Sequence, residues 1–185
     1  MPRIKKYCEQ DVIEKATVLF WKHGYQATSM QMLEKAMGIN KFSIYASFKN
    51  KEGVFLACIK AYKEKSKEMF QRFHNGNQGV ADIKQLFYDS MCTWYQNDEK
   101  KGCFVTQSYQ EFAETEAIFK NEIWDREGIK ELFRIKLAKD PQKDEETLNK
   151  QVNFLILSLQ SLGTITKVSC PNEVKDYIEM VFNRI

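Results

Sequence analysis

Apolar residues recur every three or four positions along most of the chain, the spacing of a helix with one buried face. Turn-forming residues separate several of these segments, most clearly HNGNQG at 74–79. No segment alternates convincingly with period two, so no sheet is expected. The pattern predicts an all-α fold of about nine helices, at 11–23, 30–37, 41–48, 51–72, 81–95, 103–112, 115–139, 145–167 and 172–185.

Two very short helices near the N-terminus predict a helix-turn-helix. Thr28 and Ser29 supply a cap for helix 30–37, Gly38 supplies a left-handed residue after it, and Asn40 caps helix 41–48. In this motif the second helix lies in the major groove of DNA. Short outward side chains plus one lysine suit that position. Within this helix Ile44, Tyr45 and Phe48 are expected to face inward, and Lys41, Phe42, Ser43, Ala46 and Ser47 outward.

Two lysines occupy unusual positions at helix starts. Lys41 and Lys51 are the first residues of their predicted helices, where the helix dipole is already positive, and each costs about 0.3–1 kcal/mol there. The placement is explained if lysine and backbone N–H groups bind one phosphate together. Tyr45 could bury its ring and reach a phosphate with its hydroxyl. The alternative is a pair of tolerated charges of the wrong sign.

The net charge of +3 is unevenly distributed. Residues 1–52 carry nine Lys or Arg and five Asp or Glu, whereas residues 53–185 carry nineteen and twenty. Between Lys15 and Lys51 a single acid, Glu34, accompanies six lysines. An acid-poor basic segment is typical of a surface that contacts a polyanion. Chance clustering of solvated lysines is the alternative.

Other functional classes find little support in the composition. Five cysteines at wide spacing and two histidines indicate neither a disulfide framework nor a metal site. We find no phosphate-binding loop and no nucleophile motif, so we expect no cofactor and no enzymatic activity. The polar N-terminus and the interrupted apolar run 154–162 predict neither a secretory signal nor a membrane span, so we expect a cytoplasmic protein.

Helix 145–167 carries apolar residues on two faces. One stripe is Leu148, Val152, Leu155, Ile156 and Leu159, and the other is Phe154, Leu157, Leu162 and Ile165. A helix that is apolar on two faces must be covered on both. We expect a second copy of the chain to cover one of them, with helix 172–185 beside it. A central core helix within one chain is the alternative.

Residues 16–55 resemble the DNA-binding segment of the tetracycline-repressor (TetR) family. The landmarks occur in order: LF…GY at 19–25, the Thr28–Ser29 cap, A-x-G-I at 36–39, S-I-Y…F at 43–48 and K-E at 51–52. Phe42 stands where the family commonly has a small residue, and Ala46-Ser47 replaces a pair that is often aromatic or His. These departures bear on the operator sequence rather than on DNA binding.

The resemblance implies a helix-turn-helix domain at 1–50 and a ligand-binding and dimerisation domain at 51–185. It implies a homodimer, joined through helices 145–167 and 172–185, that binds palindromic operator DNA and that a small-molecule inducer releases. The DNA-binding residues expected are Thr28, Ser29, Lys41, Phe42, Ser43, Tyr45, Ser47 and Lys51. The ligand-binding residues expected are Met91, Trp94, Tyr95, Cys103, Phe112 and Trp124, although helical spacing also suits core positions. A helical carrier or protein-interaction module that never meets DNA is the alternative function.

Cys103 follows Gly102 at a predicted helix start, beside Lys100 and Lys101. A helix dipole and nearby cations lower a thiol pKa and increase the thiolate fraction. The Gly-Cys start, together with SLGTITKVSCP near the C-terminus, resembles the branch of the family that senses electrophiles or oxidants. In that case Lys167 is expected to approach Cys103. A buried, inert cysteine is the alternative.

Overall fold

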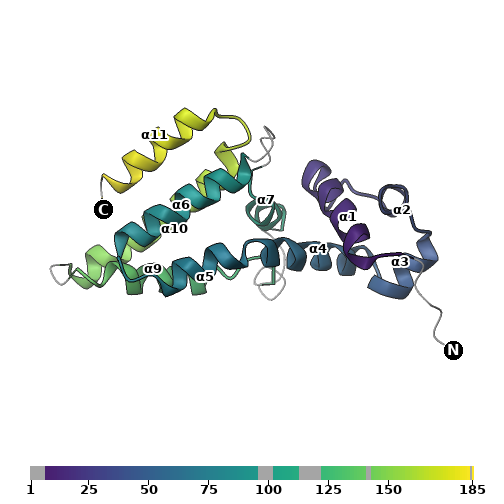
Figure 1. Cartoon of the computed structure of the whole chain (residues 1–185), viewed down its shortest axis with the longest axis horizontal. Helices are drawn as coiled ribbons and strands as arrows, with labels where there is room; N and C mark the ends of the chain where they lie inside the picture. The colour runs from purple at the N-terminus through teal and green to yellow at the C-terminus, as the bar shows by residue number, and fades with distance from the viewer. Residues whose placement is uncertain (1–6, 96–101, 113–121, 141–142, 184) are drawn as a thin grey trace.

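The computed structural model describes residues 7–95, 102–112, 122–140, 143–183 and 185. These residues form ten helices and no strand, as expected for an all-α fold. Figure 1 shows an elongated molecule with α1–α3 at one end, α4 leading away from them, and the remaining helices packed at the other end. None of the described helices is long and apolar enough to cross a membrane.

The N-terminal unit consists of α1 (Glu9–His23), α2 (Met30–Met37) and α3 (Lys41–Phe48). Their boundaries follow the predicted caps. The Ser29 hydroxyl accepts a hydrogen bond from the Met32 amide at 3.2 Å, and the Asn40 side chain accepts one from Ser43 at 2.8 Å. Gly38 is left-handed, with φ 69°, as a residue that ends a helix and reverses the chain commonly is.

The predicted helix 51–72 is wrong in one respect, because the structure divides it at Ser66. α4 (Lys51–Lys65) ends there and α5 (Lys67–Asn75) begins directly after it. The Ser66 amide donates to the Lys63 carbonyl at 3.1 Å, and its hydroxyl donates to the Tyr62 carbonyl at 3.4 Å. Such local bonds from serine compete with regular helix geometry.

The C-terminal unit contains α6 (Val80–Trp94), α7 (Phe104–Glu111), α9 (Arg126–Leu137), α10 (Glu145–Ile165) and α11 (Pro171–Phe182). The predicted helix 115–139 is not continuous in its described part. α9 begins only after Asp125, whose carboxylate accepts a hydrogen bond from the Gly128 amide at 2.9 Å. The predicted cap Thr115 lies outside the described residues.

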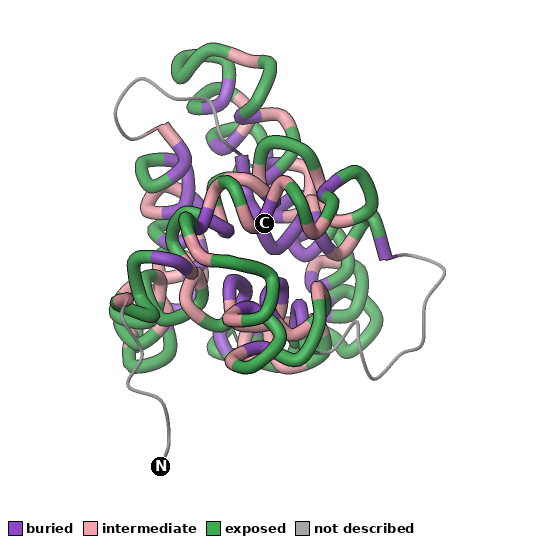
Figure 2. Tube along the Cα trace, turned by 90° about the vertical axis from the view of Figure 1, so that its right-hand side faces the viewer, coloured by how far each residue is buried: buried purple, intermediate pink, exposed green. Residues whose placement is uncertain are grey.

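The core is one cluster that runs through both units, and buried positions turn inward along the trace (Figure 2). The first predicted stripe of α10 is buried throughout, from Leu148 to Leu159. The second stripe is divided: Leu162 is fully buried, whereas Phe154 is 41% and Leu157 57% exposed. α10 therefore keeps an apolar face that the described residues of its own chain leave open.

Candidate functional site

α3 presents a compact surface at the end of the molecule. Phe42 is 72% exposed and Tyr45 44% exposed, and Lys41 and Ala46 are also exposed. We call these four residues the α3 surface. The expectation that Tyr45 faces inward is wrong: its ring lies in the open, 5.8 Å from the Lys41 ammonium. The surface is thus mixed, with one cation, two aromatic rings and one small residue.

Buried residues on the opposite side of α3 fix its orientation. Ile44 is fully buried and Phe48 nearly so, as predicted from their spacing. Ser47 is half-buried, and its hydroxyl lies 2.7 Å from the Tyr7 hydroxyl. Ser43 is also half-buried, and its amide is part of the Asn40 cap. These anchors leave the α3 surface facing away from the body of the protein.

Two of the residues expected to contact DNA are used inside the protein instead. Thr28 is buried, and its hydroxyl donates to the Gly24 carbonyl at 2.6 Å. The Lys51 ammonium donates to the Tyr25 and Thr28 carbonyls, both at 3.0 Å, and lies 4.2 Å from the Tyr25 ring centroid. Lys51 therefore ties the start of α4 to the segment between α1 and α2, and both side chains are engaged within the protein rather than directed at a phosphate.

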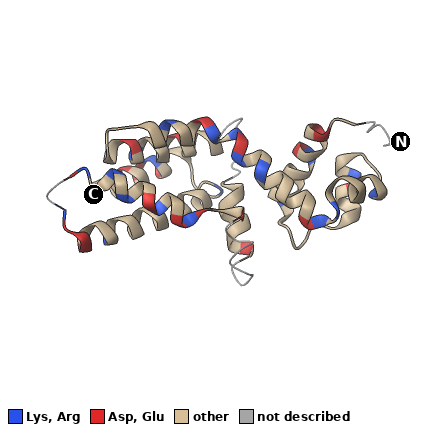
Figure 3. Ribbon diagram, turned by 90° about the horizontal axis from the view of Figure 1, so that it is seen from below, with Lys and Arg blue, Asp and Glu red and all other residues tan. Residues whose placement is uncertain are grey.

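The single acid of the basic segment also has a structural role. The Glu34 carboxylate accepts a hydrogen bond from the backbone amide of Lys41 at 2.9 Å, so this amide is already paired. The charged residues of the segment from Lys15 to Lys51 are lysines apart from Glu34, and the ribbon in Figure 3 is coloured by charge type. This arrangement suits attraction to a polyanion.

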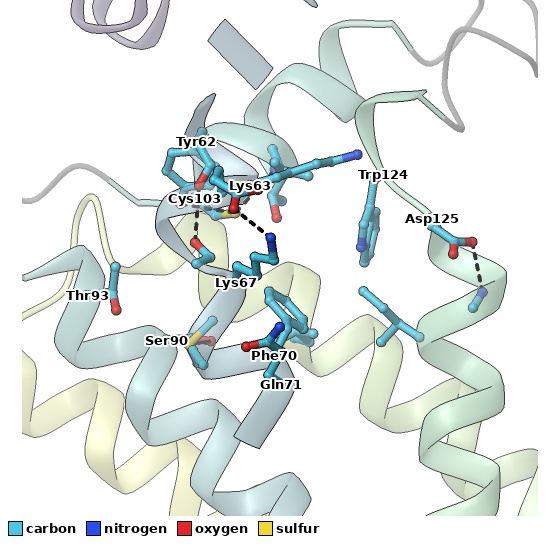
Figure 4. Close-up of a pocket in the computed structure, with 18 of the residues that line it drawn as sticks. Tyr62, Lys63, Lys67, Phe70, Gln71, Ser90, Thr93, Cys103, Trp124 and Asp125 are labelled. Carbon is cyan, nitrogen blue, oxygen red and sulfur yellow. Dashed lines mark hydrogen bonds and ion pairs between the residues drawn. The ribbon is translucent and has the colours of Figure 1, made fainter. Parts of the chain in front are cut away.

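A cavity of about 660 Å³, within the range of small-molecule sites, lies between α4 and α5 on one side and helices of the C-terminal unit on the other (Figure 4). Its walls are mostly apolar and come from α4, α5, α6, α7, α9 and α10. In Figure 4, Tyr62 and Cys103 lie together at one side and Trp124 faces them from the other. The apolar and aromatic lining is Tyr62, Met69, Phe70, Trp94, Val105, Trp124, Ile129, Leu132 and Leu159.

Three of the six expected ligand-binding residues line this cavity: Trp94, Cys103 and Trp124. The other three do not. Met91 is core, the Tyr95 hydroxyl donates to the Ser169 carbonyl at 2.9 Å, and Phe112 packs against Tyr25 and Phe55.

Sequence reasoning missed the contribution of α4 and α5, including Tyr62, Lys63 and Phe70. The apolar positions of 51–72 fit one face of a single helix. No residue type near Ser66 indicates that the helix breaks there, beside the cavity. The signal in the sequence that could have indicated this part of the cavity is the aromatic pair Tyr62 and Phe70, for which the predicted helix 51–72 gave no role.

Cys103 occupies the N-terminal end of α7, as predicted. Its sulfur accepts a hydrogen bond from the Thr106 amide at 3.4 Å, and the Tyr62 hydroxyl lies 3.9 Å from it. That hydroxyl also accepts from the Trp94 indole N–H at 3.0 Å, and burial raises the pKa of Tyr62 well above its ordinary value. The three side chains form a hydrogen-bonded row on the cavity wall.

Lys167 lies near this row without being seen to pair with the thiol. Its ammonium bonds the Gln107 side chain, and burial lowers the pKa of Lys167.

Glycine is needed at position 163 of α10 because the start of α7 comes very close to it. The Cys103 amide donates to the Gly163 carbonyl at 2.8 Å, and a Cβ at 163 would meet the Cys103 Cβ at 2.8 Å.

α7 connects the cavity with the N-terminal unit. Its N-terminal end carries Cys103 on the cavity wall. Its C-terminal end carries Glu111, whose carboxylate accepts hydrogen bonds from the Tyr25 and Gln26 amides at 2.8 and 2.6 Å. Phe112 continues this contact, with its ring centroid 5.0 Å from that of Tyr25. Movement of α7 would therefore reach the segment between α1 and α2 directly.

The described residues contain no group of three or more His, Cys, Asp or Glu side chains arranged to hold a metal ion. The arrangement offers a surface for a polyanion and an apolar cavity, connected by α4 and α7.

Comparison with known proteins agrees with this geometry. Residues 12–58 match the family described as bacterial regulatory proteins, tetR family. The HTH-type transcriptional repressor ComR of Escherichia coli (strain K12) is 32% identical over 105 residues, which are 56% of this chain and 50% of that protein. The chain thus spans about half the length of this curated relative.

Solved structures share the fold of the whole chain. A cysteine mutant of the TetR family transcriptional regulator CifR, complexed with 26-bp operator DNA, superposes with a TM-score of 0.81 over 98% of both chains at 20% identity. FadR from Bacillus subtilis, in complex with stearoyl-CoA, superposes with a TM-score of 0.72 at 13% identity, over 96% of this chain and 100% of that one. Residues 12–58 thus match the tetR family of bacterial regulatory proteins, and the whole chain shares the fold of solved TetR family regulators.

Proposed function

We propose that the chain is a ligand-responsive transcriptional repressor that binds palindromic operator DNA as a homodimer. Residues 1–50 would bind DNA, and residues 51–185 would bind ligand and form the dimer. The observation that carries the proposal is the outward placement of the α3 surface on a short, well-anchored helix after the Gly38 turn. A helix so placed can lie in the major groove, with half-sites about one turn of DNA apart.

The expected DNA contacts are revised by the side chains' positions. Lys41 and Tyr45 are exposed and could reach phosphates, while the exposed Phe42 and Ala46 would face the bases. Ser43 and Ser47 lie on the same helix as these residues, and Ser29 caps α2. The Ser29 and Ser47 hydroxyls and the Ser43 amide are already engaged within the protein. Phosphate contacts set the position of the helix, and base contacts set its preference.

Ligand binding in the cavity would act through α4 and α7. Both helices line the cavity and both contact the N-terminal unit, through Lys51 in α4 and Glu111 in α7. A ligand shifts the equilibrium only by its differential affinity for the two arrangements. A coupling free energy of about 1–3 kcal/mol would weaken operator binding roughly 5- to 150-fold.

The cavity favours a neutral, apolar or aromatic ligand. The lysines on its rim already have partners: Lys63 donates to the Glu122 carbonyl at 2.6 Å, and Lys67 pairs with Glu64 at 2.7 Å. Asp125 caps α9. An anionic ligand would have to displace these partners, whereas an aromatic ligand could pack against Phe70 and Trp124.

Cys103 supports a second candidate, a ligand that reacts with the thiol. The sulfur lines the cavity, at the N-terminal end of α7. Alkylation rates measured for each cysteine with a bimane reagent would test it. The candidate requires Cys103 to react faster than both the buried Cys58 and the exposed Cys92, and equal or slower reaction would reject it.

DNA binding is tested by selecting bound duplexes from a random pool with the purified protein. We expect a palindrome to be enriched, and affinity for it to fall steeply as salt rises, because phosphate binding releases counterions. Lys41→Gln should bind more weakly and reduce the salt dependence, while Lys60→Gln, an exposed lysine of α4 outside the basic segment, serves as a charge-matched control. A carrier or protein-interaction module would retain no duplex at any salt concentration.

A further inference from the structure

Phe42 is the most exposed aromatic side chain among the described residues, at 72%. It is the second residue of α3, between the exposed Lys41 and the half-buried Ser43. The neighbouring Ile44 and Phe48 supply the anchoring of the helix, so Phe42 contributes little to the core. Nothing in the described part of the chain covers its apolar surface, which is therefore available to a partner molecule.

The location of Phe42 limits what that partner can be. When a helix-turn-helix docks, the N-terminal residues of its second helix contact base edges in the major groove. A phenyl ring has no hydrogen-bonding group, so it distinguishes bases only through apolar contact. Of the four bases, thymine alone presents an apolar group there, its C5-methyl.

We propose that Phe42 reads a thymine in each operator half-site by packing its ring against the C5-methyl group. The inference rests on the proposed function, since it requires α3 to enter the major groove. It adds a specific residue, a specific base and a specific chemical group to that function. Wedging of the ring between base pairs is disfavoured, because side chains that do so act from the minor groove.

Replacing thymine by deoxyuridine removes the methyl group and leaves base pairing unchanged. The operator obtained by selection is synthesised with each thymine replaced in turn, symmetrically in both half-sites, and affinities are measured at fixed salt. For the wild-type protein we expect one position at which replacement weakens binding about fourfold per half-site, the factor that corresponds to one buried methyl group.

Phe42→Ala should weaken binding to the thymine operator and lose the distinction between thymine and deoxyuridine at that position. Phe42→Leu should keep part of it, because its side chain is still apolar. Val18→Ala, which removes another exposed apolar side chain from α1, is the control and should behave as wild type. Thermal melting of each variant shows that the fold is intact.

The outcomes separate this inference from the proposed function. If a palindrome is selected but no deoxyuridine replacement weakens wild-type binding, or if Phe42→Ala keeps the distinction, the thymine contact is overturned while DNA binding stands. If the protein retains no duplex at all, the proposed function fails and the contact fails with it.

Discussion

At the scale of single residues, a buried ion pair stands out in the C-terminal unit. Lys136 is only 4% exposed, and its ammonium lies 2.9 Å from the Asp82 carboxylate and 2.6 Å from the Gly76 carbonyl. It also lies 5.1 Å from the Phe73 ring centroid. The pair joins α9 to the start of α6 and to the loop before it.

Lys136→Met should destabilise the protein strongly, because it leaves the Asp82 charge partly buried without its ion partner. We expect the free energy of unfolding in urea to fall by roughly 3–5 kcal/mol. Lys84→Met, which removes a lysine from a more exposed pair with Glu179, should cost less than about 1 kcal/mol. Similar losses for the two variants would contradict the interpretation.

Cys58 makes stability depend on pH in the alkaline range. Burial raises the pKa of its thiol from 9.0 to about 12, so above pH 9 the unfolded chain loses this proton while the folded chain keeps it. The contribution of this thiol to the free energy of unfolding is therefore fully present below pH 9 and is lost as the pH rises towards 12.

The difference in unfolding free energy between wild type and Cys58→Ala isolates this effect from other groups that titrate nearby. It should shrink by about 1 kcal/mol for each pH unit above 9. Chemical denaturation at two alkaline pH values and at pH 8 measures it, and a difference that stays constant would show that the folded thiol titrates normally.

At the scale of elements, α7 is the most direct connection between the cavity and the N-terminal unit. Glu111→Ala removes the acceptor of the Tyr25 and Gln26 amides. Hydrogen exchange at these two amides should accelerate about tenfold, the factor for a loss of about 1.4 kcal/mol. Gln110→Ala, on the same exposed turn, should leave both rates unchanged. Unchanged rates in Glu111→Ala would show that α7 does not hold this segment.

Local signals allowed most elements to be predicted from the sequence. The boundaries of α2 and α3 are set by Ser29, Gly38 and Asn40, which form hydrogen bonds with residues only a few positions away. These boundaries could therefore be predicted without knowing the rest of the fold. The break at Ser66 could not be predicted in this way. At this break the Ser66 side chain bonds a nearby carbonyl, while the helical spacing of apolar residues continues before and after it. The spacing alone therefore predicts one continuous helix.

The candidate site was predictable only where side chains act on their own helix. The exposure of Lys41 and Phe42 followed from helix periodicity. The capture of Lys51 by the Tyr25 and Thr28 carbonyls did not, because these groups lie more than twenty residues away along the chain. The cavity likewise depends on how six helices meet.

At the scale of the whole molecule, the two ends of the elongated fold differ in charge and in exposed apolar surface. The end with α3 carries an excess of lysine, and the far end carries an apolar face of α10 with Phe154 and Leu157 exposed. α11 adds the exposed Met180. Side-by-side association of two chains along these exposed faces of α10 and α11 would leave both α3 surfaces free for one duplex.

Replacing both Phe154 and Leu157 by Asp should therefore convert the proposed dimer into a monomer, because two charges in each chain would be brought against an apolar partner face. Sedimentation equilibrium measures the change, and affinity for the palindromic operator should fall with it, since each monomer holds one half-site. Ile135→Asp places a charge on an equally exposed apolar position of α9 and should leave the dimer intact. If the double variant remains dimeric while Ile135→Asp dissociates, the two chains meet through α9 and the spacing of the two α3 surfaces must be derived again from that contact.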